Sequence, residues 1–263
     1  MSSLWEAVDA AFQRLESRPD FEPRPVQRQM AQFVCEQLER GQSAMVEAPT
    51  GVGKSLAALL PAIAYSLQQR KRVVISTYTA MLAEQYWRKD LPLALSLFPT
   101  APEVALAMGR SRYACVDIIR GNKASRVRPE LANSLQQWVG VAHEGVESEL
   151  HEFLRRRGVP ERFMRGLWEH IAVPSACRAR LCPYYPTCFY YQARERARRA
   201  GIVITNHAFV LADAMVRQAT DGAASLLDDY DYLILDEAHD FLDAAASALE
   251  FDLDSNFVDR LIA

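Results

Sequence analysis

The octapeptide APTGVGKS at residues 48–55 is the feature that most restricts the fold of this chain. It pairs a small first residue with Gly-Lys-Ser at its end, and it lies between a predicted strand at 43–48 and a predicted apolar helix reaching about residue 69. Gly51 and Gly53 let the backbone curl so that its N–H groups face phosphate oxygens, and the helix N-terminus adds a favourable dipole. The motif therefore predicts a nucleotide-binding loop in an α/β fold.

A second motif, YLILDEAHD at 232–240, supplies acids directly after four apolar strand residues. Asp236 suits Mg²⁺, and Glu237 suits polarising the water that attacks the γ-phosphate. Lys54 would reach the β- and γ-phosphates, and the Ser55 hydroxyl would ligate Mg²⁺. A plain glycine-rich turn is the alternative for the first motif alone. Together, in this order, the two motifs predict nucleoside triphosphate hydrolysis, with Lys54, Asp236 and Glu237 as the catalytic residues.

Apolar runs alternate with helical patterns along most of the chain, which predicts a doubly wound, mostly parallel sheet. One predicted helix ends at Gly41 and carries Cys35 on its apolar face, so we expect Cys35 in the core. The predicted strands are 43–48, 72–77, 103–109, 201–206 and 230–236, and the predicted helices outside 110–200 are 4–16, 26–40, 55–69 and 79–88.

Charge is spread unevenly over the 263 residues. Residues 110–200 hold 17 Lys and Arg against 9 Asp and Glu, a net charge of +8, whereas residues 201–263 hold 2 against 13, a net charge of −11. The basic block interrupts the strand–helix alternation and reads as an insertion between two strands. It fits a polyanion-binding insert as well as it fits a solvated helical surface.

Four of the five cysteines lie in this basic block, at Cys115, Cys177, Cys182 and Cys188. The N-terminus has no signal-peptide pattern, and the longest nearly apolar run, 55–67, is too short to span a bilayer. We therefore expect a cytoplasmic protein with reduced thiols, in which clustered cysteines indicate metal. Four thiolates suit an iron–sulfur cluster, but they also make structural zinc sites, and the spacing alone leaves both open.

Several stretches resemble the XPD/DinG family of iron–sulfur superfamily 2 DNA helicases, and the bacterial DinG/YoaA branch most. The matching stretches occur in the family's order and cover nearly the whole chain. The chain resembles only the N-terminal part of a family member. It rests on FEPRPVQRQM (21–30), EAPTGVGKS (47–55), STYTAMLAEQ (76–85), GRSRYAC (109–115), VITNHAFVLAD (203–213) and DEAH (236–239).

The resemblance implies ATP and Mg²⁺ as cofactors, with Ser55 and Asp236 on the metal, together with a [4Fe–4S] cluster. The four clustered cysteines match the family's cluster ligands. Gln27 would read the adenine, with Phe21 and Arg24 near the base. The remaining nucleotide contacts that it implies are Thr50, Gly51, Val52, Gly53, Lys54, Asp236 and His239.

The resemblance also implies movement from 5′ to 3′ on single-stranded DNA, with forked or 5′-tailed DNA as the substrate of a monomeric bacterial enzyme of replication or repair. Such an enzyme would be nucleoid-associated when on DNA. Arginines for phosphates and flat rings for bases fit this role, although core packing is the alternative for each ring and a solvated helix face for ERARRAG at 195–201. The DNA-contact candidates are Thr77, Thr79, Arg112, Tyr113, Arg178, Arg180, Tyr185, Asn206 and His207.

The family pattern assigns residues 1–109 to the first part of a RecA-like lobe and 110–200 to the iron–sulfur insert. Residues 201–247 continue the lobe through the DEAH box, and 248–263 would begin an arch domain. A family helicase continues into a second lobe that supplies arginine fingers. We therefore expect slow hydrolysis and no unwinding from this portion alone. Two alternatives remain: a non-motor iron–sulfur DNA-binding module with a vestigial or switch-like ATP site, and a zinc-bearing ATPase unrelated to DNA.

Overall fold

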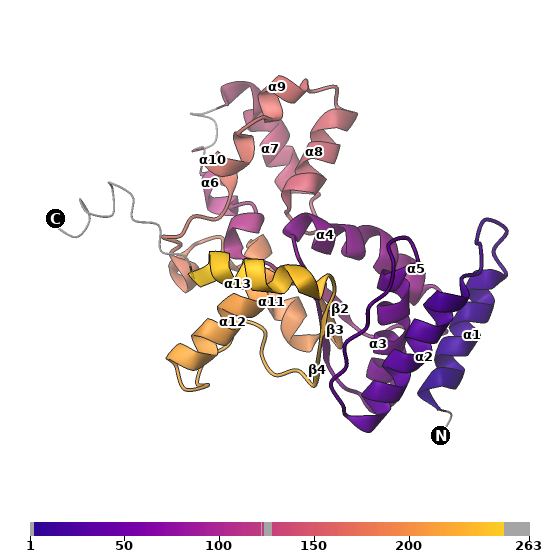
Figure 1. The fold of residues 1–263 in the computed structure, drawn as a ribbon. Coiled ribbons are helices and arrows are strands. Elements are labelled where there is room, and N and C mark those ends of the chain that lie inside the picture. The colour runs from indigo at the N-terminus through magenta and orange to yellow at the C-terminus, as the bar shows by residue number, and fades with distance from the viewer. Residues whose placement is uncertain (1–2, 122, 124–127, 250–263) are drawn as a thin grey trace. The chain divides into compact units, whose positions relative to one another are not determined.

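The computed structural model describes residues 3–121, 123 and 128–249. The described residues form two compact units, one within 3–102 and 201–249 and the other within 103–200. Figure 1 shows their helices and strands. Within the described ranges, no helix is long and apolar enough to cross a membrane. The predicted start of an arch domain at 248–263 lies outside the described residues, except for two positions that end a helix.

A parallel sheet forms the centre of the first unit. Its strands are β1 (Val73–Thr77), β3 (Ile202–Asn206) and β4 (Tyr232–Leu235), in the order β3-β1-β4. Val73 pairs with both Ile202 and Tyr232, and all the pairings of β1 with β3 and β4 are parallel. Every residue of β1 is buried, as expected for a central parallel strand that is covered on both faces. The predicted α/β fold with a parallel sheet is therefore confirmed.

Helices cover this sheet on both sides. In Figure 1, α12 and α13 lie on one side of the strands, and α1, α2 and α3 lie on the other. Helices α1, α2 and α3 pack against one another, and α12 packs against α13. The helices of this unit are α1 (Leu4–Glu16), α2 (Pro25–Arg40), α3 (Lys54–Gln69), α4 (Ala80–Gln85), α5 (Leu91–Leu95), α12 (His207–Ala219) and α13 (Phe241–Leu249).

The end and the buried face of α2 follow the sequence pattern. Gly41 ends the helix in the left-handed conformation, with φ of 66°, where glycine has no Cβ to clash. Cys35 is 1% exposed, and burial, with Glu39 nearby, raises the pKa of its thiol to about 12. The prediction that Cys35 is a core residue is confirmed.

The predicted strand at 43–48 is wrong. The described chain has no helix or strand from Gln42 to Pro49, and Met45 is 93% exposed. An apolar run becomes a strand only where a neighbouring strand supplies backbone hydrogen-bond partners. In this structure β4 pairs with one edge of β1, and residues 43–48 form no strand beside β4. The run therefore remains extended loop ahead of the nucleotide motif.

The second unit is mostly helical, with short connecting turns. Leu135 and Trp138 of α7 and Leu150 and Leu154 of α8 are buried and form its apolar core. The predicted strand at 103–109 is shorter here, as β2. The elements are β2 (Val104–Leu106), α6 (Val116–Arg120), α7 (Ala132–Val139), α8 (Glu147–Arg156), α9 (Glu161–Met164), α10 (Leu167–Ile171) and α11 (Phe189–Arg199), with 3₁₀ turns at Arg110–Arg112, Pro129–Leu131, Ala179–Leu181 and Tyr185–Thr187.

Candidate functional site

The loop before α3 has the geometry of an anion-binding turn. Gly51 and Gly53 adopt φ of 82° and 84°, and Gly53 caps α3, which is 16 residues long. Lys54 and Ser55 begin that helix, so their backbone N–H groups belong to its unpaired first turn. Thr50 is exposed and Val52 is half-buried. The loop therefore presents N–H donors and a lysine at one end of an apolar, buried helix.

Two side chains from the N-terminal end of α2, its cap residue Arg24 and Gln27 of its first turn, brace this loop. Arg24 Nη1 donates to the carbonyl oxygen of Gly51 at 2.6 Å, and Gln27 Nε2 donates to that of Gly53 at 2.9 Å. Gln27 is only 2% exposed, and its Oε1 has no hydrogen-bond partner among the described residues. Phe21 is half-buried nearby in sequence. Gln27 and Arg24 thus hold the loop in this structure, and contact with a base stays a prediction.

Gly53→Ala should destabilise the folded protein more than Gly51→Ala. Each glycine has a left-handed φ, so a side chain costs either position about 1–2 kcal/mol. A Cβ on Gly53 would also lie 2.1 Å from Gln27 Nε2, whereas one on Gly51 meets nothing within 4 Å. Gln27 must then turn away and leave buried polar groups unpaired, which adds about 1–3 kcal/mol. Urea unfolding of both variants measures the difference, and equal losses would show that Gln27 does not brace the loop.

The DEAH segment meets the loop directly. Lys54 Nζ lies 3.1 Å from Glu237 Oε1, although the two residues are 183 positions apart in the chain. The backbone N–H of Asp236 donates to the carbonyl oxygen of Ser76 at 2.8 Å, which fixes the segment to the end of β1. Glu237 adopts φ of 53°, a region that non-glycine residues rarely occupy. His239 is exposed, with Nδ1 3.5 Å from Glu237 Oε2.

A π-helical turn, Tyr86–Asp90, brings two further polar side chains to the same place. Tyr86 is buried, and its hydroxyl donates to Asp236 Oδ2 at 2.7 Å. Burial raises the pKa of Asp90, and a hydrogen bond with Ser55 partly opposes that rise. Ser55 also hydrogen-bonds the Tyr86 hydroxyl. Single π-turns recur at functional sites, and this one surrounds the two predicted Mg²⁺ ligands with a phenol and a carboxylate.

Sequence reasoning did not identify Tyr86 and Asp90 as site residues. The helix predicted at 79–88 is present as α4, but the chain continues through the π-turn into α5. The one available signal was a tyrosine and an aspartate four positions apart, a spacing that places both on one face of a helix.

Three of the predicted DNA contacts are buried and cannot be surface contacts in this structure. Thr77, Tyr113 and His207 are each 0% exposed. The Tyr113 hydroxyl donates to the carbonyl of Leu106 and accepts from the N–H of Met108, both at 3.2 Å, so its polar end is satisfied inside the second unit. Elements distant in sequence cover these three side chains in this structure, and DNA contact by them stays a prediction.

Thr79 and Asn206 act as helix caps. Thr79 Oγ1 accepts from the N–H of Leu82 at 3.2 Å, and Asn206 Oδ1 accepts from the N–H of Phe209 at 3.3 Å. Each of these bonds satisfies a donor of the first helical turn. The remaining candidates vary in exposure: Arg112, Arg178 and Arg180 are exposed, and Tyr185 is half-buried with its ring centroid 4.5 Å from that of Tyr191.

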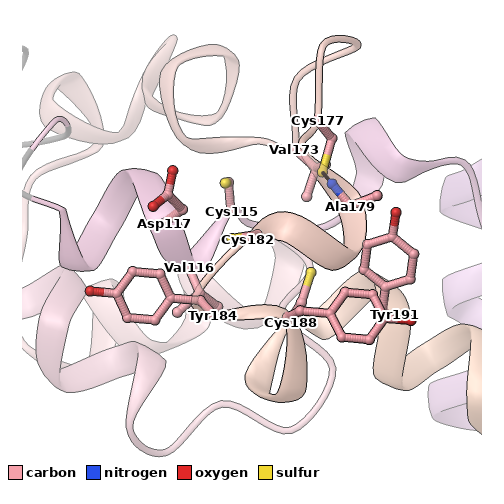
Figure 2. Close-up of a pocket in the computed structure, with 11 residues that line it drawn as sticks. Cys115, Val116, Asp117, Val173, Cys177, Ala179, Cys182, Tyr184, Cys188 and Tyr191 are labelled. Atoms are coloured by element: carbon pink, nitrogen blue, oxygen red, sulfur yellow. Dashed lines mark hydrogen bonds between the residues drawn. The ribbon is translucent and has the colours of Figure 1, made fainter.

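The four clustered cysteines line one hollow in the second unit (Figure 2). Cys115 precedes α6, Cys188 precedes α11, and Cys177 and Cys182 flank a 3₁₀ turn between them. The hollow measures about 280 Å³ including the part open to solvent. The fold thus brings together all four thiols of the basic block.

Polar and aromatic side chains surround these thiols. Figure 2 places Asp117 and Tyr184 on one side of the hollow and Tyr191 on the other. The N–H of Ala179 donates to Cys177 Sγ at 3.4 Å, from a residue with φ of 49°. Burial raises the pKa of the Cys115 and Cys188 thiols. Among the described residues, no group of three or more His, Cys, Asp or Glu is arranged to hold a metal ion.

The parallel sheet, the glycine-rich loop and the acids beside its lysine define a P-loop nucleotide-binding fold, and comparison with known families agrees. The family model of DEAD/DEAH box helicases matches residues 24–101, and the DEAD_2 model matches residues 173–258. Over these two regions the chain is therefore similar to DEAD/DEAH box helicases.

Within that class the chain is DinG-like. It is 33% identical over 235 residues to the ATP-dependent DNA helicase YoaA of Escherichia coli K12, covering 87% of this chain and 35% of YoaA. It is 32% identical over 266 residues to the ATP-dependent DNA helicases DinG of Escherichia coli K12 and of Salmonella typhimurium, covering 95% of this chain and 36% of each DinG. The chain therefore spans about a third of the length of these curated relatives.

Proposed function

We propose that this chain is the ATP-binding N-terminal portion of an ATP-dependent DNA helicase that moves 5′ to 3′ on single-stranded DNA. The observation that carries the proposal is the contact between Lys54 and Glu237, with Asp236 held beside them by Tyr86. Two motifs that are distant in sequence thereby form one cationic and acidic site at the carboxyl ends of parallel strands, where open α/β sheets bind ligands.

Each group at this site has a distinct role in the proposal. Bound ATP·Mg²⁺ would supply the scissile phosphoanhydride and the charge that polarises it. Lys54 would leave Glu237 and neutralise the β- and γ-phosphates, while Ser55 and Asp236 hold the metal. Glu237, released from the lysine, would orient the attacking water and accept its proton. The loop N–H groups would face the phosphate oxygens.

We further propose that Cys115, Cys177, Cys182 and Cys188 hold a [4Fe–4S] cluster. Support comes from the donor set, since four thiols from two distant stretches of the chain line one hollow. The Ala179 N–H that points to Cys177 Sγ is the kind of outer contact that tunes a bound cluster. When bound, the cluster would crosslink segments that otherwise share few buried apolar contacts.

Single-stranded DNA is the polyanion that we propose for the basic block. The exposed Arg112, Arg178 and Arg180 can neutralise phosphates, although Arg178 also pairs with Asp117 at 3.0 Å. Because the chain spans about a third of its relatives, unwinding is proposed for the longer protein that would contain it. We expect slow hydrolysis and no strand separation from residues 1–263 alone.

Lys54→Ala tests the nucleotide site. It removes the ammonium that would meet the phosphates, so ATP affinity should fall by about 1.5–3 kcal/mol, roughly tenfold to a hundredfold. Hydrolysis should fall roughly 10²- to 10³-fold, the effect of removing one preorganised charge-stabilising group. Titration with a fluorescent ATP analogue and a phosphate-release assay measure both quantities. Lys71→Ala is the control, because Lys71 is a partly exposed lysine of the same unit that pairs with Asp231.

The outcomes separate the motor from the alternatives. DNA-stimulated hydrolysis that is lost in Lys54→Ala supports the helicase portion. ATP binding without hydrolysis, in protein that still binds DNA, supports a non-motor module with a switch-like site. Hydrolysis that is insensitive to DNA supports an ATPase unrelated to DNA, and unchanged ATP affinity in Lys54→Ala would contradict the proposed site.

A further inference from the structure

His207 occupies a buried position that connects three parts of the first unit. It begins α12 directly after β3, and its side chain is 0% exposed. Its Nδ1 lies 2.7 Å from the hydroxyl of Ser76 in β1. Its ring packs edge-on to Phe241, the first residue of α13, with ring centroids 5.1 Å apart. This histidine therefore lies between the central strand and the segment that follows the DEAH box.

The second ring nitrogen of His207, Nε2, differs from Nδ1 in its surroundings. His207 Nε2 is buried and has no hydrogen-bond partner among the described residues. Burial lowers the pKa of His207, and the main chain of Glu237 and Asp236 only partly opposes this change. A neutral imidazole carries one proton. When the Ser76 hydroxyl donates to Nδ1, that proton is on Nε2, near the main chain of the DEAH segment.

The main-chain acceptors near this N–H are already partly committed. The carbonyl of Glu237 accepts from the N–H of Asp240 at 3.0 Å, within the turn that follows the acid. The N–H of Asp236 donates to the carbonyl of Ser76, which fixes the peptide that precedes Asp236. The Asp236 carbonyl belongs to the peptide that follows, and the main chain of both Asp236 and Glu237 lies near the His207 ring. That following peptide leads directly into Glu237, whose backbone is in a left-handed conformation.

We propose that His207 is a positioning residue for Glu237: its Nε2–H donates to the main-chain carbonyl of Asp236 in the conformation that hydrolyses ATP. This inference rests on the proposed ATPase function. Ser76 fixes the ring from β1, and Phe241 fixes it from α13, so the ring has little freedom of its own. A hydrogen bond from a fixed ring would hold the DEAH peptide in one orientation, and with it the carboxylate that orients water.

Two substitutions of His207 each keep one polar contact of the ring and remove the other. His207→Asn keeps a polar atom near Nδ1 for Ser76 but removes the reach to Asp236. His207→Gln places an amide N–H near Nε2 and gives up the contact with Ser76. Positional errors of an ångström can cost roughly a hundredfold in rate. We therefore expect kcat for ATP hydrolysis to fall roughly tenfold to a hundredfold in His207→Asn, with less than a twofold change in ATP Kd, and to recover largely in His207→Gln.

Steady-state ATP hydrolysis, ATP titration and thermal unfolding of the three purified proteins measure these effects. Loss of kcat in His207→Asn with recovery in His207→Gln supports the inference. Equal activity in all three proteins overturns it, and so does an equal loss in both variants with matching falls in the unfolding midpoint, which would mark a purely structural histidine. Wild-type protein that binds no ATP, or hydrolyses none, would instead contradict the proposed function.

Discussion

Glu237→Gln should lower ATP hydrolysis by about 10²- to 10⁴-fold while leaving ATP bound as tightly as before or slightly tighter. The drop is the usual contribution of a general base, because glutamine cannot accept the proton of the attacking water. The affinity should not fall, since the substitution also removes the carboxylate that holds Lys54 at 3.1 Å. Both side chains of that pair are partly exposed, so its loss favours ATP by about 0.2–1 kcal/mol, less than about sixfold.

Phosphate release and titration with a fluorescent ATP analogue separate the two effects. Glu36→Gln is the matched control, because Glu36 is a partly exposed acid on α2 that pairs with Arg40 away from the loop. Glu36→Gln should change neither the rate of ATP hydrolysis nor the affinity for ATP. A Glu237→Gln protein that hydrolyses ATP at the original rate would remove Glu237 from the chemistry. A large fall in affinity would show that Glu237 binds the nucleotide and that Lys54 is not its competitor.

Cys182→Ser should abolish the iron content of the purified protein and loosen the chain around residues 174–187, while ATP affinity changes less than twofold. Loss of one of four ligands removes the crosslink on which this stretch depends. Between Val173 and Cys188, both of which are buried, no residue is buried, and the regular structure is limited to two 3₁₀ turns. The nucleotide site belongs to the other compact unit, whose sheet and apolar helices do not include these residues.

Iron and sulfide analysis, visible absorbance and limited proteolysis measure this result. Cys35→Ala is the control, since Cys35 is a core cysteine of α2 outside the hollow, and its iron content should match that of the unchanged protein. Full iron content in Cys182→Ser would remove Cys182 from the ligand set. Zinc without iron or sulfide in the unchanged protein would replace the proposed cluster with a structural zinc site.

The nucleotide loop, the DEAH acids and three strands could be predicted from the sequence because each is specified locally. The run Val73–Thr77 is apolar and β-branched enough to favour a buried strand wherever it pairs. The order of glycine, lysine and serine fits only a loop that turns into a helix. In these cases the residue types near one another in sequence already determine the structure.

The errors arose where structure depends on a partner elsewhere in the chain. The run at 43–48 has strand-like residues but no strand beside it. Tyr113 and His207 look like surface candidates by motif, yet both are buried, with polar contacts to Leu106 of β2 and to Ser76 of β1. Tyr86 and Asp90 were missed because a π-turn is a deviation from helical spacing that a 3.6-residue pattern does not predict. Burial and pairing are tertiary properties, so a local pattern leaves them open.

The π-turn has a further consequence for changes in chain length. The π-turn inserts one extra residue between α4 and α5. Residues after the turn are therefore displaced by one position from those of an uninterrupted α-helix. Deleting a single residue from Tyr86–Asp90 would let the turn close as regular α-helix, so Leu91 and Ala94 would keep their buried positions. The shortened turn would lose the wide spacing that places Tyr86 beside Asp236 and Asp90 near Ser55. A one-residue deletion in this turn should therefore disturb the polar arrangement of the site more than it disturbs the fold.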